Sequence, residues 1–230
     1  MRPRPPRSTL VPYTTLFRSN WLKLQHEYDC FFFVADWHAL TTHYEDPQII
    51  GDSVMDMVID WLAAGVSPGN ARIFVQSDVP QHAELHLLLS MVTPLGWLER
   101  VPSYKDQQEK LREKDLATYG FLGYPLLQSA EILMYKAGQV PVGEDQKQHV
   151  ELCRDLAIKF NNTYSETFKV PEVYIPKTAA RVKSMQDPSR KMSKSDSNQS
   201  GCVYLLDPPN VVRKKIRSAV TDSGAEVRAG

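Results

Sequence analysis

Alternating apolar and amphipathic stretches divide the chain into predicted strands and helices. Residues 30–35 form an apolar run of strand length, and further strands are predicted at 71–76 and, shorter, at 139–142. A continuous apolar run is typical of a parallel strand that is buried on both faces. Apolar residues recur with helical spacing elsewhere, which predicts helices at 20–28, 46–61, 80–92, 123–137 and 144–160. This alternation predicts an α/β fold with a parallel sheet.

Polar side chains follow the predicted strands directly. Asp36 and His38 come after the first run, residues 76–78 after the second, and residues 143–146 after the third. In open parallel sheets, ligands bind beyond the carboxyl ends of the strands. The sequence carries neither a Walker motif nor G-x-G-x-x-G, so a bound nucleotide needs another kind of cradle.

Composition narrows the possible classes of protein and of binding site. The chain has 230 residues and a formal net charge of zero, so no global basic field argues for nucleic acid. The three cysteines lie far apart and form no CxxC pair. This spacing argues against a disulfide framework or a zinc site, and favours a reducing cytosol. No apolar run reaches the length of a membrane-spanning helix.

The predicted helix at 123–137 carries one polar stripe on an otherwise apolar surface. Tyr124, Gln128, Glu131 and Tyr135 are spaced so that they share one face. Buried polar groups need partners, so one interpretation is the wall of a pocket whose ligand brings its own hydrogen-bonding groups. The alternative is a stripe that faces water.

Two short segments carry candidate chemistry. Residues 140–146 read VPVGEDQ, in which Gly143 lets a ligand approach the backbone closely and Asp145 is a candidate partner for sugar hydroxyls. Acidic residues at a helix start also suit the helix dipole, which is the simpler explanation. Residues 191–195 read KMSKS, and their lysines and serines suit a pyrophosphate leaving group. The alternative is a solvated basic loop.

Taken together, these segments resemble a known family. KMSKS is the second signature of class I aminoacyl-tRNA synthetases, and within that class the chain is similar to the bacterial tryptophanyl-tRNA synthetases. The resemblance spans residues 20–228 and is carried by residues 35–41, 76–82, 124–160, 191–196 and 218–223. It implies a Rossmann-like parallel sheet of a class I catalytic domain, followed by the start of a helical C-terminal domain.

The resemblance also implies an activity and its partners. The tryptophan carboxylate would attack the α-phosphate of ATP, pyrophosphate would leave with Mg²⁺ carried by the ATP, and the tryptophanyl group would pass to tRNA(Trp). No covalent protein nucleophile is needed, because catalysis rests on positioning and charge stabilisation. The family further implies a cytoplasmic homodimer without membrane association.

Individual site residues follow from the same resemblance. Lys191 and Lys194 are the implied catalytic residues, and no protein metal ligand is implied. The implied ATP contacts are Gly143, Glu144, Asp145, Val182, Lys191, Met192, Ser193, Lys194 and Ser195. The implied tryptophan contacts are His38, Tyr124, Gln128, Glu131, Val140, Val142 and Gln146. Family members commonly carry aspartate in place of Glu131, where it accepts the indole N–H, so the longer side chain bears on fine specificity.

The ends of the chain depart from the family. The first signature, a His-Ile-Gly-His-like sequence expected before residue 20, is absent, and residues 1–19 read as a foreign segment in which residues 9–11 can extend but Pro12 breaks a strand. We expect a catalytic domain at 20–200 and the truncated start of a tRNA-binding domain at 201–230.

Two alternatives to an active ligase remain open. One is a non-catalytic remnant that binds tryptophan or adenine nucleotide weakly. For residues 1–19 the separate alternative to a foreign segment is a divergent native N-terminus. The other is a tyrosine-specific relative, against which VPVGEDQ and the intact KMSKS argue. Because the first signature supplies phosphate contacts, we expect the chain to fold but to activate tryptophan poorly or not at all.

Overall fold

The computed structural model describes residues 9–10, 18–101, 118–143, 146–175, 184–189, 198–204 and 207–220. The chain divides into two compact units, Met1–Ala179 and Ala180–Gly230. The boundary expected at residue 200 therefore falls inside the second unit. In the segments that the structure describes, no helix is both long enough and apolar enough to cross a bilayer.

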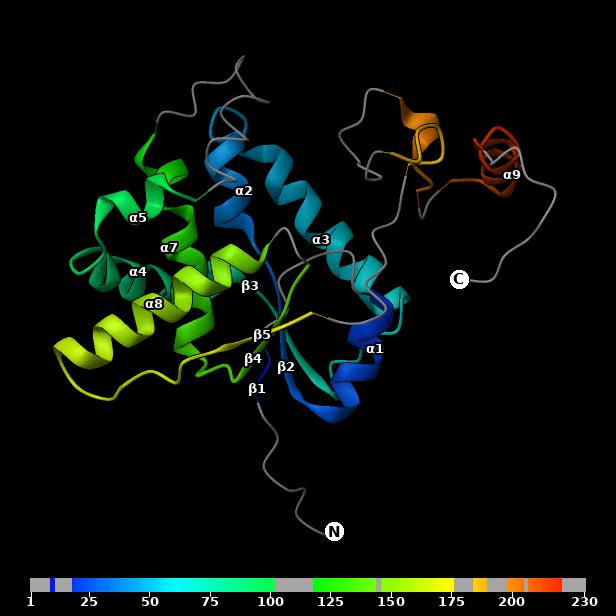
Figure 1. The fold of residues 1–230 in the computed structure, drawn as a ribbon. Coiled ribbons are helices and arrows are strands. Elements are labelled where there is room, and N and C mark those ends of the chain that lie inside the picture. Colours follow the sequence, from blue (N-terminus) through cyan, green and yellow to red (C-terminus); the bar gives the residue numbers. More distant parts are fainter. Residues whose placement is uncertain are drawn as a thin grey trace, which may run out of the picture. The chain divides into compact units, whose positions relative to one another are not determined.

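A parallel sheet forms the centre of the first unit (Figure 1). Its strands are β1 (Thr9–Leu10), β2 (Asp29–Val34), β3 (Ala71–Val75), β4 (Gln139–Pro141) and β5 (Glu172–Tyr174). They lie in the order β3-β2-β1-β4-β5, and every ladder is parallel. The predicted α/β fold with a parallel sheet is thus confirmed. Two residues from the N-terminal segment, Thr9 and Leu10, occupy the middle position of this sheet.

The helices of the first unit largely match the predicted ones. They are α1 (Arg18–Glu27), α2 (Asp36–His43), α3 (Gln48–Ala63), α4 (Gln81–Ser90), α5 (Leu95–Glu99), α7 (Tyr119–Met134) and α8 (Lys147–Thr163). The short helices α2 and α5 were not predicted. Helix α7 begins four residues earlier than expected because Thr118 caps it, with its hydroxyl accepting a hydrogen bond of 3.2 Å from the Phe121 backbone N–H.

The two faces of β2 contribute to two different cores. Cys30, Phe32 and Val34 point to one face and pack with Trp21 of α1 and Trp61 of α3. The Trp21 ring stacks on Phe32 with centroids 4.6 Å apart and meets Trp61 edge-on at 5.6 Å. Strand residues alternate between faces, so the intervening phenylalanines point the other way.

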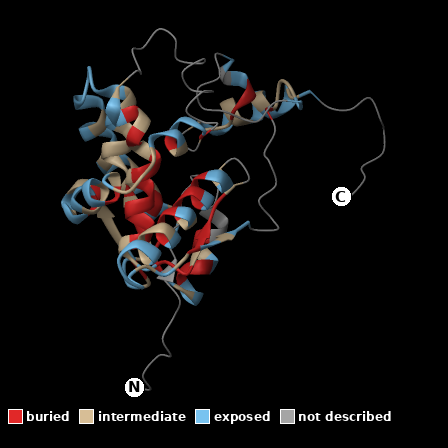
Figure 2. Cartoon of the chain, turned by 60° about the vertical axis from the view of Figure 1, so that its left-hand side comes forward, coloured by how far each residue is buried: buried red, intermediate tan, exposed pale blue. Residues whose placement is uncertain are grey.

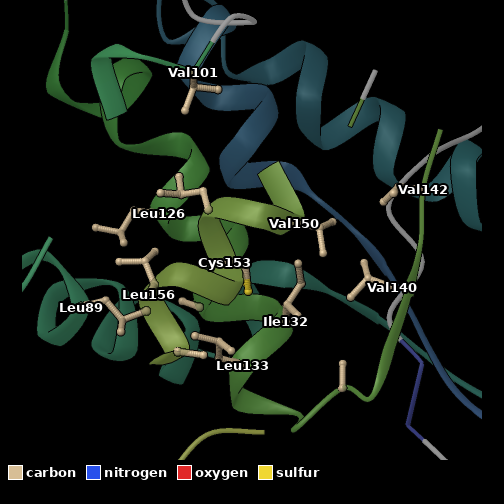
Figure 3. Close-up of a cluster of buried hydrophobic side chains, with 14 of the residues drawn as sticks. Leu89, Val101, Leu126, Ile132, Leu133, Val140, Val142, Val150, Cys153 and Leu156 are labelled. Carbon is tan, nitrogen blue, oxygen red and sulfur yellow. The ribbon is translucent and has the colours of Figure 1, made fainter. Parts of the chain in front are cut away.

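Phe31 and Phe33 pack against the larger core, on the face covered by α4, α7 and α8 (Figure 1). Figure 2 colours the buried residues of the chain red. The fully buried members of the larger core include Leu89, Leu126, Ile132, Leu133, Val140, Val142, Val150, Cys153 and Leu156. Figure 3 shows the side chains of α7 and α8 interleaving there. The prediction that residues 30–35 form a strand packed on both faces is confirmed, and this packing holds the carboxyl ends of the strands beside α7.

The second unit contains a 3-10 turn, η4 (Gln199–Gly201), and helix α9 (Pro209–Arg217). The Met185 backbone N–H donates to the Gly201 carbonyl at 3.0 Å, and the Val220 N–H donates to the Met185 carbonyl at 2.7 Å. These bonds tie the segment before η4 to the residues after α9. That this unit begins a helical tRNA-binding domain remains a prediction.

Candidate functional site

The carboxyl ends of β2 and β3 are joined by two side chains. The 3-10 turn η2 (Gln76–Asp78) follows β3 directly. The amide oxygen of Gln76 accepts a hydrogen bond of 2.9 Å from the Trp37 backbone N–H, and the carboxylate of Asp36 accepts one of 3.1 Å from the Ser77 N–H. The Asp36 side chain therefore accepts a hydrogen bond from a free backbone N–H at the start of η2, and the Gln76 side chain does the same at the start of α2.

Glu131 is the centre of a buried polar network at this edge of the sheet. Its side chain is 0% exposed. Its two oxygens lie 3.0 and 3.2 Å from Nε2 of His38, and the Gln76 side-chain amide also donates to it. A buried carboxylate is costly unless its oxygens are hydrogen-bonded, and both His38 and Gln76 lie within hydrogen-bonding distance of them. The alternative that the polar stripe of α7 faces water is therefore wrong for Glu131.

A second polar chain connects α7 with α8. Nδ1 of the buried His149 lies 2.8 Å from Oε1 of Gln128, and its Nε2 lies 3.5 Å from the Tyr124 hydroxyl. Gln128 is 2% exposed, yet its Nε2 has no hydrogen-bond partner among the described residues. Buried donors in native proteins almost always have a partner. This amide is thus a candidate donor to a ligand.

Tyr135, the fourth member of the stripe, belongs to a different cluster. Its hydroxyl lies 2.9 Å from Nε2 of the buried His82, whose Nδ1 lies 3.0 Å from the Gln76 carbonyl oxygen. Burial, followed by the negative charge of Glu131, raises the pKa of Tyr135 to about 12. The Tyr135 and His82 side chains therefore support the backbone carbonyl of Gln76.

An apolar hollow of about 400 Å³ lies beside this network. Its lining includes Trp37, Leu40, Tyr44, His86, Tyr124 and Leu127. Burial and the neighbouring His38 lower the pKa of His86, against a weaker opposing effect of Glu131. This volume is in the range of small-molecule sites. Of the residues predicted to bind tryptophan, Tyr124 lines this hollow.

The structure brings some of the predicted site residues together. His38, Tyr124 and Glu131 form one group, since the His38 and Tyr124 rings meet edge-on with centroids 6.2 Å apart. Val140 and Val142 are fully buried in the larger core. Gln146 precedes α8, and its backbone N–H donates to the Gly143 carbonyl at 2.9 Å. Their roles as ligand contacts stay predictions.

Several predicted residues lie outside the described part of the chain. They are Glu144, Asp145, Val182, Lys191, Met192, Ser193, Lys194 and Ser195. Conversely, sequence reasoning missed His82 and His149 as members of the polar clusters, and His86 as part of the lining of the hollow. The helical spacing of α8 places His149 on its apolar face, and that signal alone did not distinguish it from a core residue.

Comparisons with known proteins point to one family. The model for "tRNA synthetases class I (W and Y)" matches residues 14–230. A tryptophan–tRNA ligase of Ralstonia nicotianae is 72% identical over 145 residues, which cover 63% of this chain and 36% of that protein. A tryptophan–tRNA ligase of Clostridium tetani is 47% identical over 209 residues, covering 91% of this chain and 61% of that protein. The chain thus spans less than two thirds of the length of these curated relatives.

Solved structures agree. The tryptophanyl-tRNA synthetase of Mycoplasma pneumoniae superposes with a TM-score of 0.86 at 34% identity, covering 96% of this chain and 68% of that one. The enzyme of Campylobacter jejuni, solved as a complex with ADP and tryptophan, gives a TM-score of 0.81 at 33% identity, covering 94% and 68%. The expected Rossmann-like class I fold is confirmed by these neighbours.

Proposed function

The chain belongs to the class I tRNA synthetases for tryptophan and tyrosine, and we propose that it is a tryptophan–tRNA ligase that activates L-tryptophan with ATP. Relatives at 42–72% identity are tryptophan–tRNA ligases, which supports tryptophan over tyrosine. The observation that carries the proposal is the buried carboxylate of Glu131. An indole offers one N–H donor, and a carboxylate is a strong acceptor for it.

The proposed site assigns roles on both sides of the reaction. His38, Tyr124 and Glu131 orient the amino acid, together with Gln128, Gln146, Val140 and Val142. Gly143, Glu144, Asp145 and Val182 hold ATP, and residues 191–195 follow its phosphates. The tryptophan carboxylate oxygen forms a bond to the α-phosphorus while the bond from that phosphorus to pyrophosphate breaks. Lys191 and Lys194 stabilise the leaving charge, alongside Mg²⁺ that arrives with ATP.

The proposal also covers oligomeric state and location: the protein is a homodimer in the cytoplasm that charges tRNA(Trp). Support for self-association comes from exposed apolar side chains on and just after α4, where Leu87, Leu88 and Met91 are 56%, 60% and 71% exposed. Contiguous exposed apolar surface of this kind commonly marks protein interfaces.

Selective ligand binding tests the proposal directly. We expect the chain to bind L-tryptophan at least tenfold more tightly than L-tyrosine in isothermal titration calorimetry (about 1.4 kcal/mol per factor of ten). The hydroxyl donor of tyrosine lies at the end of its ring and not at the position of the indole N–H, so it leaves the buried acceptor unmatched. Equal affinity for the two amino acids, or none for either, would contradict it. ATP–pyrophosphate exchange then separates an active ligase from a chain that only binds.

His149 offers a test of the second polar chain. His149→Leu removes the imidazole contact that orients the Gln128 amide, and we expect tryptophan affinity to fall by roughly three- to tenfold, in line with the loss of one hydrogen bond. His149→Asn keeps an N–H near the position of Nδ1 and should restore most of that loss. Calorimetry on both variants provides the measurement. An equal loss in the two variants would mean that His149 contributes packing alone.

A further inference from the structure

Gln76 is a buried amide that forms hydrogen bonds in two directions. It follows β3 directly and is fully buried. Its Oε1 accepts a hydrogen bond of 2.9 Å from the Trp37 backbone N–H, and its Nε2 donates to Oε1 of Glu131. These partners lie 39 and 55 residues away in the sequence and belong to α2 and α7. A single side chain therefore connects η2, α2 and α7 at the carboxyl edge of the sheet.

The two partners allow the Gln76 amide only one orientation. A backbone N–H can donate a hydrogen bond but cannot accept one, so the amide oxygen has to face Trp37. The NH₂ group then has to face Glu131. Turning the amide over would set donor against donor and acceptor against acceptor in a buried place, which is costly. The Glu131 oxygen that meets the amide is thus held as a hydrogen-bond acceptor.

The backbone on both sides of the Gln76 side chain is also held in place. The Gln76 carbonyl oxygen lies 3.0 Å from Nδ1 of His82, which is itself fully buried. The next backbone N–H, that of Ser77, donates to the carboxylate of Asp36 at 3.1 Å. Side chains that are locked by such surrounding contacts hold a binding group in one geometry. The amide is therefore oriented toward Glu131 before any ligand arrives.

We propose that Gln76 is a positioning residue that decides which ligands Glu131 accepts. By facing Oε1 of Glu131 with an N–H, it keeps this oxygen an acceptor and fixes the direction in which the carboxylate meets a ligand donor. A ligand that offers an N–H, such as an indole ring, is then favoured over one without a donor at that position. Naming the indole rests on the proposed ligase function, whereas the two hydrogen bonds of Gln76 do not.

The competing explanation is that Gln76 only ties the start of α2 to η2. The Asp36 side chain separates the two explanations, because its hydrogen bond to the Ser77 N–H joins the same segments without involving Glu131. Gln76→Met keeps an unbranched side chain and removes both hydrogen bonds of the amide. Asp36→Ala is the matched control. Calorimetry gives the affinity of each variant for L-tryptophan and for the analogue with sulfur in place of the ring nitrogen, with circular dichroism as the check on folding.

We expect Gln76→Met to weaken tryptophan binding by about tenfold, in line with the loss of a hydrogen bond to a charged group, and binding of the sulfur analogue by less than about threefold. The preference for tryptophan over the analogue should fall accordingly. Asp36→Ala should change both affinities alike and leave this preference as in the parent chain. Gln76→Asn keeps the amide but is one methylene shorter, so it cannot span both partners. It should also lower the preference, and it carries the test if Gln76→Met does not fold.

A double variant shows whether Gln76 acts through Glu131. Added to Glu131→Gln, Gln76→Met should lower the preference for tryptophan no further, because residues of one hydrogen-bonded network are not additive. A further loss would overturn the inference, as would an unchanged preference in Gln76→Met or an equal loss of preference in Asp36→Ala. A parent chain without any preference for tryptophan over the analogue would contradict the proposed indole contact itself, and the inference with it. A parent that discriminates, beside a Gln76→Met variant that discriminates equally well, would contradict the role of Gln76 alone.

Discussion

The substitution Glu131→Gln is expected to weaken tryptophan binding by about ten- to a hundredfold, because a hydrogen bond to a charged acceptor contributes roughly 1.5–3 kcal/mol. The substitution keeps the size of the side chain and leaves an amide oxygen that can still accept from Gln76. It removes the charge that faces His38 and the proposed indole N–H. The loss should therefore fall on the ligand rather than on the fold.

A tryptophan analogue without the indole N–H isolates this contact. Calorimetry on Glu131→Gln should show a large loss for tryptophan and a small one for the analogue with sulfur in place of the ring nitrogen. Tyr135→Phe is the matched control, because Tyr135 caps the C-terminal end of the same helix and its hydroxyl lies beside His82. It should affect the two ligands alike. Equal losses for both ligands in Glu131→Gln would remove the indole contact from the proposal.

Leu156→Ala is expected to destabilise the first unit by about 2–5 kcal/mol, the range for a large-to-small change at a fully buried site. Leu156 is 0% exposed and lies in the larger core, where α8 packs against α7 (Figure 3). The cavity opens beneath the helix that carries Glu131. For a chain of this size, such a loss lowers the melting temperature by roughly 5–20 °C.

Ile158 provides the matched control for this measurement. It lies on the same helix as Leu156 but is 44% exposed. Ile158→Ala should change the free energy of unfolding by less than about 1 kcal/mol, because little packing is lost at an exposed position. Urea titrations followed by circular dichroism report both values. If the two variants unfold at the same urea concentration, the core between α7 and α8 does not control the stability of this unit.

The sequence predicted those features that depend on local pattern. Residues 30–35 became β2 because their apolar run suits a strand covered on both faces, and residues 71–76 became β3 beside it. Helix α2 escaped prediction because none of its residues is buried, so it lacks an apolar stripe. Strand β5 is three residues long, which is too short for any periodicity to appear.

The polar stripe of α7 was visible in the sequence, but its partners were not. Gln76 lies 55 residues from Glu131, His82 lies 53 residues from Tyr135, and His149 lies 21 residues from Gln128. Side-chain pairing across such separations is set by the packing of α4, α7 and α8, which no local pattern encodes. The stripe therefore indicated a buried polar network, and the structure supplied the residues that pair with it.

The three cysteines divide between the two compact units, and all of them are buried. Cys30 lies in β2 and Cys153 in α8, whereas Cys202 lies in the second unit. Burial raises the pKa of the Cys153 thiol far above its usual range, so little thiolate forms there while the unit stays closed. The rate of thiol labelling at each cysteine therefore reports a different local opening. Labelling of Cys202 reports the opening of the second unit, and labelling of Cys153 reports the separation of α7 from α8 in the first.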